Sequence, residues 1–128
     1  MDSKRATHVY IVDDSASIRT RLTDMLGRIA GVCVVGAAAT APQAVVDILA
    51  LRPDSVLLDL NLQGSNGMQV LRAIHGEAPE IVFVVLTNHS EPQYRRACKS
   101  AGAAYFLDKS TEFDRVPHVM AEITAART

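Results

Sequence analysis

Five short apolar runs rich in β-branched residues alternate with stretches of helical character. This alternation limits the possible folds more than any other feature of the sequence. The runs cover residues 9–12, 32–35, 55–58, 81–86 and 104–107. Their continuous hydrophobicity favours strands that are covered on both faces. Strict alternation of strands and helices predicts a parallel sheet with right-handed crossovers. We therefore expect a doubly wound α/β fold with five parallel strands and five helices.

The stretches between the runs carry helical periodicity and helix-boundary residues. The first has apolar residues at three- and four-residue steps, namely Ile18, Leu22, Met25, Leu26 and Ile29. The other helices are expected from Thr40 to just before Arg52, over about 66–76 and about 91–101, and from near Arg115, after a short turn capped by Ser110 or Thr111.

The composition indicates one soluble domain without a charge bias. The chain has 128 residues, with 13 basic and 14 acidic side chains and a formal net charge of −1, so nothing favours nucleic acid or an anionic membrane as a partner. The longest apolar runs are too short to span a bilayer, and no secretory signal opens the sequence. We expect a cytoplasmic protein with a single domain over 1–128 and a core over about 7–123. Cys33 and Cys98 are expected to be small buried apolar residues.

Polar and charged residues stand where four of the expected strands end. Asp13 and Asp14 follow the first strand, Asp59 the third, Thr87 ends the fourth and Lys109 follows the fifth. The carboxyl ends of parallel strands share one edge of a sheet, where ligands bind in folds of this class. Three carboxylates with a hydroxyl and an ammonium group suit Mg²⁺, a hard cation that prefers oxygen ligands. Each residue alone has an ordinary explanation, such as a helix cap or a surface amine, so the prediction depends on their shared position.

On these residues the chain resembles a response-regulator receiver domain, the phosphoacceptor half of two-component signalling. The matching features are the pair Asp13 and Asp14, the loop "DLNLQGSNG" at 59–67, Thr87, the lead-in "AGAAYF" at 101–106, and Lys109. The resemblance covers about residues 7–123 and implies a flavodoxin-like sheet with strand order 2-1-3-4-5. We expect a stand-alone receiver domain that acts as a signalling switch.

The resemblance implies that Asp59 accepts a phosphoryl group from a histidine kinase or a phosphotransfer protein. Asp14 and Asp59 would bind Mg²⁺ directly, Asp13 directly or through water, and Asn61 through its backbone carbonyl, with Mn²⁺ as an alternative ion. Lys109 would pair with Asp59 and, after transfer, with a phosphoryl oxygen. No turnover of an external substrate is expected, apart from slow loss of the domain's own phosphoryl group.

The same resemblance implies how phosphorylation changes the surface. Thr87 would donate its hydroxyl to the phosphoryl group and Phe106 would rotate into the space vacated. The fourth helix, fifth strand and fifth helix would then present an altered face to an unidentified protein partner. Tyr105 is adjacent to Phe106, and the alternation of side chains along a strand allows only one of the two rings to turn inward.

Several positions depart from the family pattern. Ser110 follows the lysine where proline is frequent, so we expect a trans bond there. Asn88 replaces a small residue and could narrow access to the phosphoryl group, and Gln63 replaces a frequent proline. Asn61 and His89 occupy positions that adjust the lifetime of the acyl phosphate in the family, although His89 is better explained as an exposed loop residue than by a role in proton transfer.

Three functions from other classes are alternatives to the switch. A metal-dependent phosphohydrolase of the haloacid-dehalogenase type would carry DxDx[TV] after the first strand, which "DDSAS" does not match. A nucleotide- or flavin-binding module would need a glycine-rich phosphate loop after a strand, and no such motif is present. A docking protein of the same fold without phosphorylation would not need every site residue, and all are present.

Overall fold

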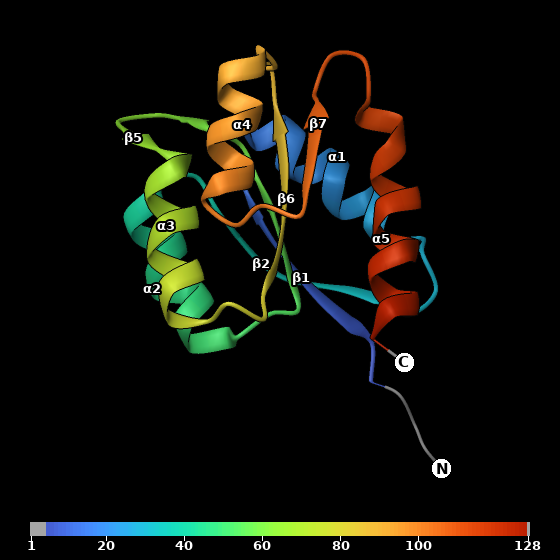
Figure 1. Cartoon of the computed structure of the whole chain (residues 1–128). Helices are drawn as coiled ribbons and strands as arrows, with labels where there is room; N and C mark the ends of the chain where they lie inside the picture. Colours follow the sequence, from blue (N-terminus) through green and yellow to red (C-terminus); the bar gives the residue numbers. More distant parts are fainter. Residues whose placement is uncertain (1–4, 128) are drawn as a thin grey trace.

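In the computed structural model, which describes residues 5–127, five strands form one parallel sheet in the order β2-β1-β3-β6-β7 (Figure 1). The strands are β1 (Thr7–Val12), β2 (Val32–Ala38), β3 (Ser55–Leu58), β6 (Val82–Thr87) and β7 (Tyr105–Asp108). Counted along the sheet strands alone, this is the expected order 2-1-3-4-5. The order reverses direction at β1, which places the topological switch point between β1 and β3.

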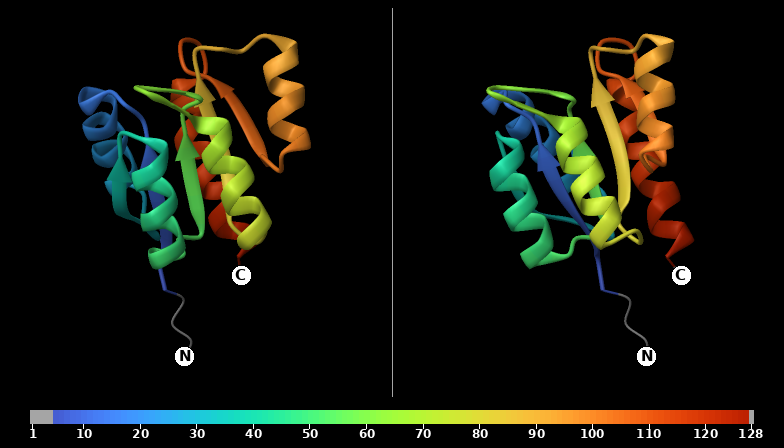
Figure 2. Two further views of the ribbon diagram at one scale, coloured as in Figure 1. Left: turned by 90° about the vertical axis from the view of Figure 1, so that its left-hand side faces the viewer. Right: turned by 60° about the vertical axis from the view of Figure 1, so that its left-hand side comes forward.

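Helices cover both faces of the sheet, as the alternation predicts. The helices are α1 (Ala16–Gly27), α2 (Ala41–Leu51), α3 (Gly67–Glu77), α4 (Pro92–Ser100) and α5 (Val116–Ala126). In Figure 1, α2 and α3 lie to the left of the sheet and α5 to its right. In the left view of Figure 2, α2 and α3 stand in front of the sheet and α5 behind it.

Two apolar clusters, one on each face, hold these layers together. One cluster joins the sheet to α2, α3 and α4 through Tyr10, Ile48, Leu71, Phe83 and Cys98. The other joins it to α1 and α5 through Ile11, Leu22, Leu57, Val84 and Met120. Adjacent residues of one strand therefore enter opposite clusters. This arrangement explains why the strands read as continuous apolar runs rather than as alternating ones.

Two helices begin with side-chain caps that the sequence supplies directly. The Ser15 hydroxyl accepts a hydrogen bond from the Ile18 amide at 3.3 Å and caps α1. At α3, the Asn66 side chain accepts from the Met68 amide at 2.7 Å, and the Gln69 side chain accepts from the Asn66 amide at 3.4 Å. This reciprocal capping box fixes the start of α3 immediately after the loop that follows Asp59.

The structure differs from the sequence-based expectations at four places. Residues 59–67 contain a small antiparallel hairpin of β4 (Asn61–Leu62) and β5 (Ser65–Asn66) that was not predicted. Helix α1 ends at Gly27, so Ile29, the last residue of the expected apolar stripe, lies beyond the helix. The turn η1 (Phe113–Arg115) begins after Glu112 instead of a Ser110 or Thr111 cap. Ser110 and Thr111 lie in a turn before η1, where the amides of both residues donate to Asp108 Oδ1.

The fourth difference concerns Cys33. This residue is exposed on β2, whereas Cys98 is buried as expected. The prediction for Cys33 was wrong because β2 is an edge strand, so its side chains are only partly covered. The bond before Ser110 is trans, as expected, since residues 5–127 contain no cis peptide bond.

Across the described part of the chain, no helix has the length and apolar character needed to cross a lipid bilayer.

Candidate functional site

Backbone hydrogen bonds that continue the sheet fix the residues at its carboxyl edge. The Asp13 amide donates to the Ala38 carbonyl at 3.1 Å, and the Asp59 amide donates to the Val12 carbonyl at 2.9 Å. The Lys109 amide donates to the carbonyl of Thr87 at 2.8 Å. The site residues therefore sit one residue beyond regular strands but remain in the ladder. This pairing brings chain segments far apart in sequence to one edge.

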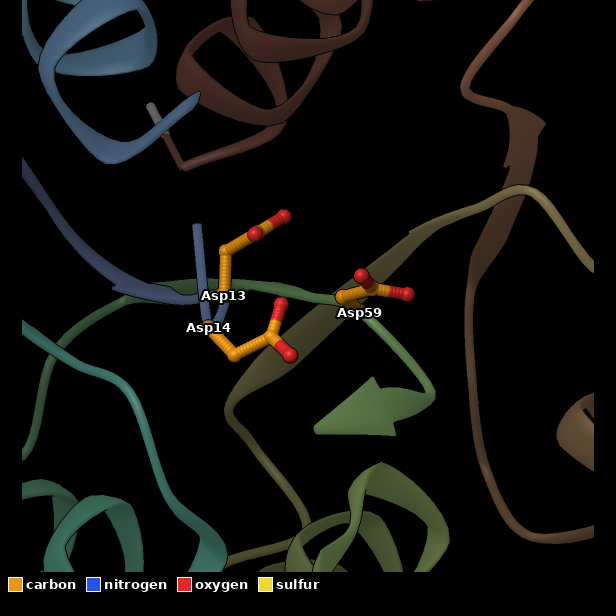
Figure 3. Close-up of side chains that lie close together, drawn as sticks. All are labelled: Asp13, Asp14 and Asp59. Atoms are coloured by element: carbon orange, nitrogen blue, oxygen red, sulfur yellow. The ribbon is translucent and has the colours of Figure 1, made fainter. Parts of the chain in front are cut away.

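Three carboxylates gather at the switch point between β1 and β3. One carboxylate oxygen from each of Asp13, Asp14 and Asp59 lies within 4.8 Å of the others (Figure 3). Asp13 is 2% exposed and Asp59 6% exposed, whereas Asp14 is exposed. Backbone amides also contribute, since Asp13 Oδ1 accepts from the Ser15 amide at 2.9 Å and Asp59 Oδ1 accepts from the Asn61 amide at 3.2 Å.

Lys109 connects the two buried carboxylates. Its ammonium group donates to Asp13 Oδ2 at 2.7 Å and to Asp59 Oδ2 at 2.8 Å, and its side chain is 12% exposed. Burial acts to lower the pKa of this amine, but the hydrogen bonds and charges of the two aspartates outweigh burial, so the pKa is raised. Lys109 therefore remains a cation at the centre of the site.

The donor set fits a hard divalent cation. All three clustered side chains offer carboxylate oxygens, and neither a sulfur nor an imidazole ligand is part of this group. One lysine ammonium cannot neutralise three carboxylates. Mg²⁺ is suited to such a site because it takes a few carboxylates and keeps several waters. The residues present are therefore consistent with the predicted cation site.

A pocket of about 270 Å³ lies beside these groups. It is lined by Asp14, Ser15, Ile18, Asp59, Asn61, Asn88, His89 and Lys109. The Thr87 side chain is fully buried at the end of β6, and its hydroxyl oxygen accepts from the His89 amide at 3.2 Å. Of the predicted site residues, the pocket thus brings together Asp14, Asp59, Asn61 and Lys109, with Asn88 and His89 at its wall, whereas Asp13 and Thr87 are not part of the lining.

Phe106 and Tyr105 point to opposite faces of β7, as the alternation predicts. Phe106 packs beside the cluster of α2, α3 and α4, and Tyr105 packs beside the cluster of α1 and α5. The Arg95 guanidinium lies over the Phe106 ring, 4.6 Å from its centroid, and also donates to the Phe106 carbonyl at 3.3 Å. The Tyr105 hydroxyl donates to Glu122 at 3.1 Å. Phe106 is not among the residues that line the pocket beside Asp59 and Lys109.

Sequence reasoning missed two residues that support the site. The Arg19 guanidinium donates to the Asp13 carbonyl at 2.7 Å, and no feature of the sequence distinguishes Arg19 from Arg21, the other arginine of α1. Gly67 lies so close to Asp59 that a β-carbon would overlap the Asp59 carbonyl. Its signal was the glycine at the end of the 59–67 loop, which predicts a close backbone approach.

The chain matches the family model described as response regulator receiver domain over residues 9–121. It is 30% identical over 119 residues to the response regulator GacA of Pseudomonas aeruginosa, covering 93% of this chain and 56% of that protein. It is 34% identical over 106 residues to a protein-glutamate methylesterase/protein-glutamine glutaminase of Idiomarina loihiensis, covering 81% of this chain and 27% of that one. The chain thus spans about half the length of GacA and about a quarter of the length of the second relative.

Solved structures agree with this match. A LuxR-family two-component response regulator from Aurantimonas sp. SI85-9A1 is 26% identical, with a TM-score of 0.87 over 94% of this chain and 86% of that one. The receiver domain of the putative response regulator NarL from Mycobacterium tuberculosis is 26% identical, with a TM-score of 0.86 over 95% and 98% of the two chains. The chain therefore belongs to the response regulator receiver domains, the phosphoacceptor switches of two-component signalling.

Proposed function

We propose that Asp59 is the residue that accepts the phosphoryl group. Of the three clustered carboxylates, Asp59 alone both lines the pocket and contacts Lys109. Asp14 lines the pocket without an ion pair to Lys109, whereas Asp13 pairs with Lys109 but is absent from the pocket lining. Within the pocket, an incoming phosphoryl group therefore meets a carboxylate that is already paired with Lys109 only at Asp59. This observation supports the assignment most directly.

The transfer would proceed by attack of an Asp59 carboxylate oxygen on the phosphorus of a phosphohistidine. An oxygen–phosphorus bond forms and the phosphorus–nitrogen bond breaks, and the electron pair and a proton from water go to the leaving imidazole. Lys109 would shift its contact from Asp59 to a phosphoryl oxygen, and the Thr87 hydroxyl would donate to another. The residues thus act mainly by position and charge.

The cation would be held by Asp13, Asp14 and Asp59, together with the backbone carbonyl of Asn61. When bound, Mg²⁺ neutralises the charge that builds up on the transferring phosphoryl group. Mn²⁺ is the expected substitute because it accepts the same oxygen ligands. The buried Asp13 would hold its place in the site, since its Oδ1 atom already accepts a hydrogen bond from the Ser15 amide.

The phosphoryl donor would be a histidine kinase or phosphotransfer protein, and the domain would act in the cytoplasm without turning over an external substrate. It would pass the signal to a protein partner that binds the face formed by α4, β7 and α5. Phe106 lies on this face beneath Arg95, so its rotation would alter the surface there. Asn61 and His89, which line the pocket, would modulate loss of the phosphoryl group. The phosphohydrolase alternative is not favoured, because the family match is to receiver domains.

The test is intact-protein mass after incubation with acetyl phosphate, with and without Mg²⁺. The wild type should gain one phosphoryl group only with Mg²⁺, and Asp59→Asn should gain none. Asp24→Asn is the matched control, because Asp24 is exposed on α1 away from the site. Full labelling of Asp59→Asn would refute the assignment. No labelling of the wild type by either acetyl phosphate or phosphoramidate would favour the docking alternative.

A further inference from the structure

Two loops at the edge of the pocket are joined by side-chain hydrogen bonds. One loop, residues 88–91, connects β6 to α4, and the other follows β7. The Ser110 hydroxyl donates to Asn88 Oδ1 at 2.9 Å. Ser90 hydrogen-bonds to Asp108, and Asp108 Oδ1 accepts from the Ser110 amide at 2.8 Å. Ser110 is thus held at its backbone while its side chain holds Asn88.

The hydrogen bond from Ser110 also orients the other end of the Asn88 amide. A carboxamide has an accepting oxygen and a donating nitrogen that point in different directions. The oxygen of Asn88 is occupied by Ser110, while its NH₂ group has no protein partner within residues 5–127. Asn88 lines the pocket together with Asp59 and Lys109, whereas Ser110 does not. This placement leaves the NH₂ group as the polar end available to the pocket.

We propose that Asn88 Nδ2 donates a hydrogen bond to a phosphoryl oxygen on Asp59, and that Ser110 is the positioning residue that aims it. A phosphoryl group has three strong acceptor oxygens, and each can accept more than one hydrogen bond. Asn88 adds a neutral, directional donor to the point charge of Lys109 and the hydroxyl of Thr87. The inference rests on the proposed function, because it requires the phosphoryl group at Asp59.

The competing explanation is that Asn88 only narrows the pocket. The two explanations predict different changes in the affinity of Asn88→Ala for a phosphoryl analogue. If Asn88 is a donor, Asn88→Ala should weaken binding of the phosphoryl analogue beryllium trifluoride. The expected loss is about tenfold, as for a hydrogen bond to a charged group. If Asn88 is only an obstacle, Asn88→Ala should bind the analogue equally well or more tightly. Binding would be measured by titration calorimetry at saturating Mg²⁺.

A second measurement reports on Asn88 itself. In the wild type, the side-chain NH₂ resonances of Asn88, assigned by their loss in Asn88→Ala, should shift on addition of beryllium trifluoride and exchange more slowly with water. Ser110→Ala should weaken binding by less than Asn88→Ala, because the amide remains but is no longer oriented. Ser100→Ala, at the exposed end of α4, should bind like the wild type.

The outcomes separate this inference from the proposed function. If the wild type is phosphorylated on Asp59 while Asn88→Ala binds the analogue as tightly as the wild type, the donor role is wrong. If Asn88→Ala weakens binding but Ser110→Ala does not, the positioning role of Ser110 is wrong. If the wild type is not phosphorylated and does not bind the analogue, the proposed function fails, and with it the basis of the inference. Weakened binding in both variants, with shifted Asn88 resonances, supports the full proposal.

Discussion

Among single residues, Lys109 compensates the charge of the two buried carboxylates of the site. Its ammonium group lies within hydrogen-bond distance of both Asp13 and Asp59, which are almost fully buried. Removing one partner of a buried ion pair leaves an uncompensated charge, which is more damaging than loss of the contact alone. The lysine is therefore a structural residue as well as a proposed participant in phosphoryl transfer.

We predict that Lys109→Met lowers the free energy of unfolding by about 3 kcal/mol in buffer containing a chelator. Urea denaturation measures this change. Added Mg²⁺ should restore part of the loss, because a bound cation replaces the missing positive charge. Lys99→Met is the control, since Lys99 is exposed on α4 and forms no ion pair within the described chain. Equal stability of the two variants without metal would contradict this electrostatic role.

Among the secondary-structure elements, the junction between β5 and α3 controls the backbone behind Asp59. The Gly67 amide donates to the Leu60 carbonyl at 2.9 Å, and α3 begins at this glycine with the Asn66 capping box. The two-residue strands of the hairpin are too short to show periodicity, which is why the sequence did not reveal them. The capping residues and the glycine, in contrast, could be read directly from the 59–67 loop and the residues that follow it.

Two glycines of α3 give a matched test of this junction. Gly67→Ala should destabilise the protein by about 2 kcal/mol, because the new methyl group must displace the Asp59 and Leu60 backbone. Gly76→Ala has open space around the added methyl group and should stabilise the helix by about 0.5 kcal/mol. Thermal or urea denaturation of both variants measures the difference. Equal effects would show that the backbone at Asp59 is not restricted in this way.

Over the whole molecule, Asp54 connects the start of β3 to both ends of the described chain. It pairs with Arg5 at 3.0 Å and Arg127 at 3.5 Å, and it accepts from the His8 amide at 2.8 Å. Burial acts to raise the pKa of Asp54, but the His8 hydrogen bond and the two arginines outweigh burial and lower it. A lowered pKa in the folded state stabilises the protein only while the carboxylate is ionised.

The contribution of Asp54 to stability should therefore depend on pH. It should be complete above the ordinary pKa of aspartate, about 3.9, and should disappear as the pH falls through the lower pKa of the folded protein. Asp54→Asn is expected to reduce the free energy of unfolding by about 1–2 kcal/mol at neutral pH. Urea denaturation at a series of pH values should show the two proteins converging in acid. A difference that stays constant with pH would exclude this linkage.

The sheet and the candidate site were largely predictable, because both follow from where apolar runs stop. Asp13, Asp59 and Lys109 each follow a strand directly, so predicting the strands also placed these side chains at one edge. The exposure of Cys33 was not predictable, since it depends on which strand lies at the edge. The hydrogen bond between Ser110 and Asn88 joins two loops whose residues are 22 positions apart. No local sequence pattern predicts how these loops lie relative to each other.

We propose that Asp59, rather than Asp13 or Asp14, carries the phosphoryl group. Sodium borohydride reduces an acyl phosphate to an alcohol, so trapping after acetyl phosphate and Mg²⁺ converts the phosphorylated aspartate to homoserine. Peptide mass spectrometry then identifies the position. We expect homoserine at position 59 only, and none without Mg²⁺. Homoserine at position 13 or 14, with an intact Asp59, would contradict the assignment of the phosphoryl group to Asp59.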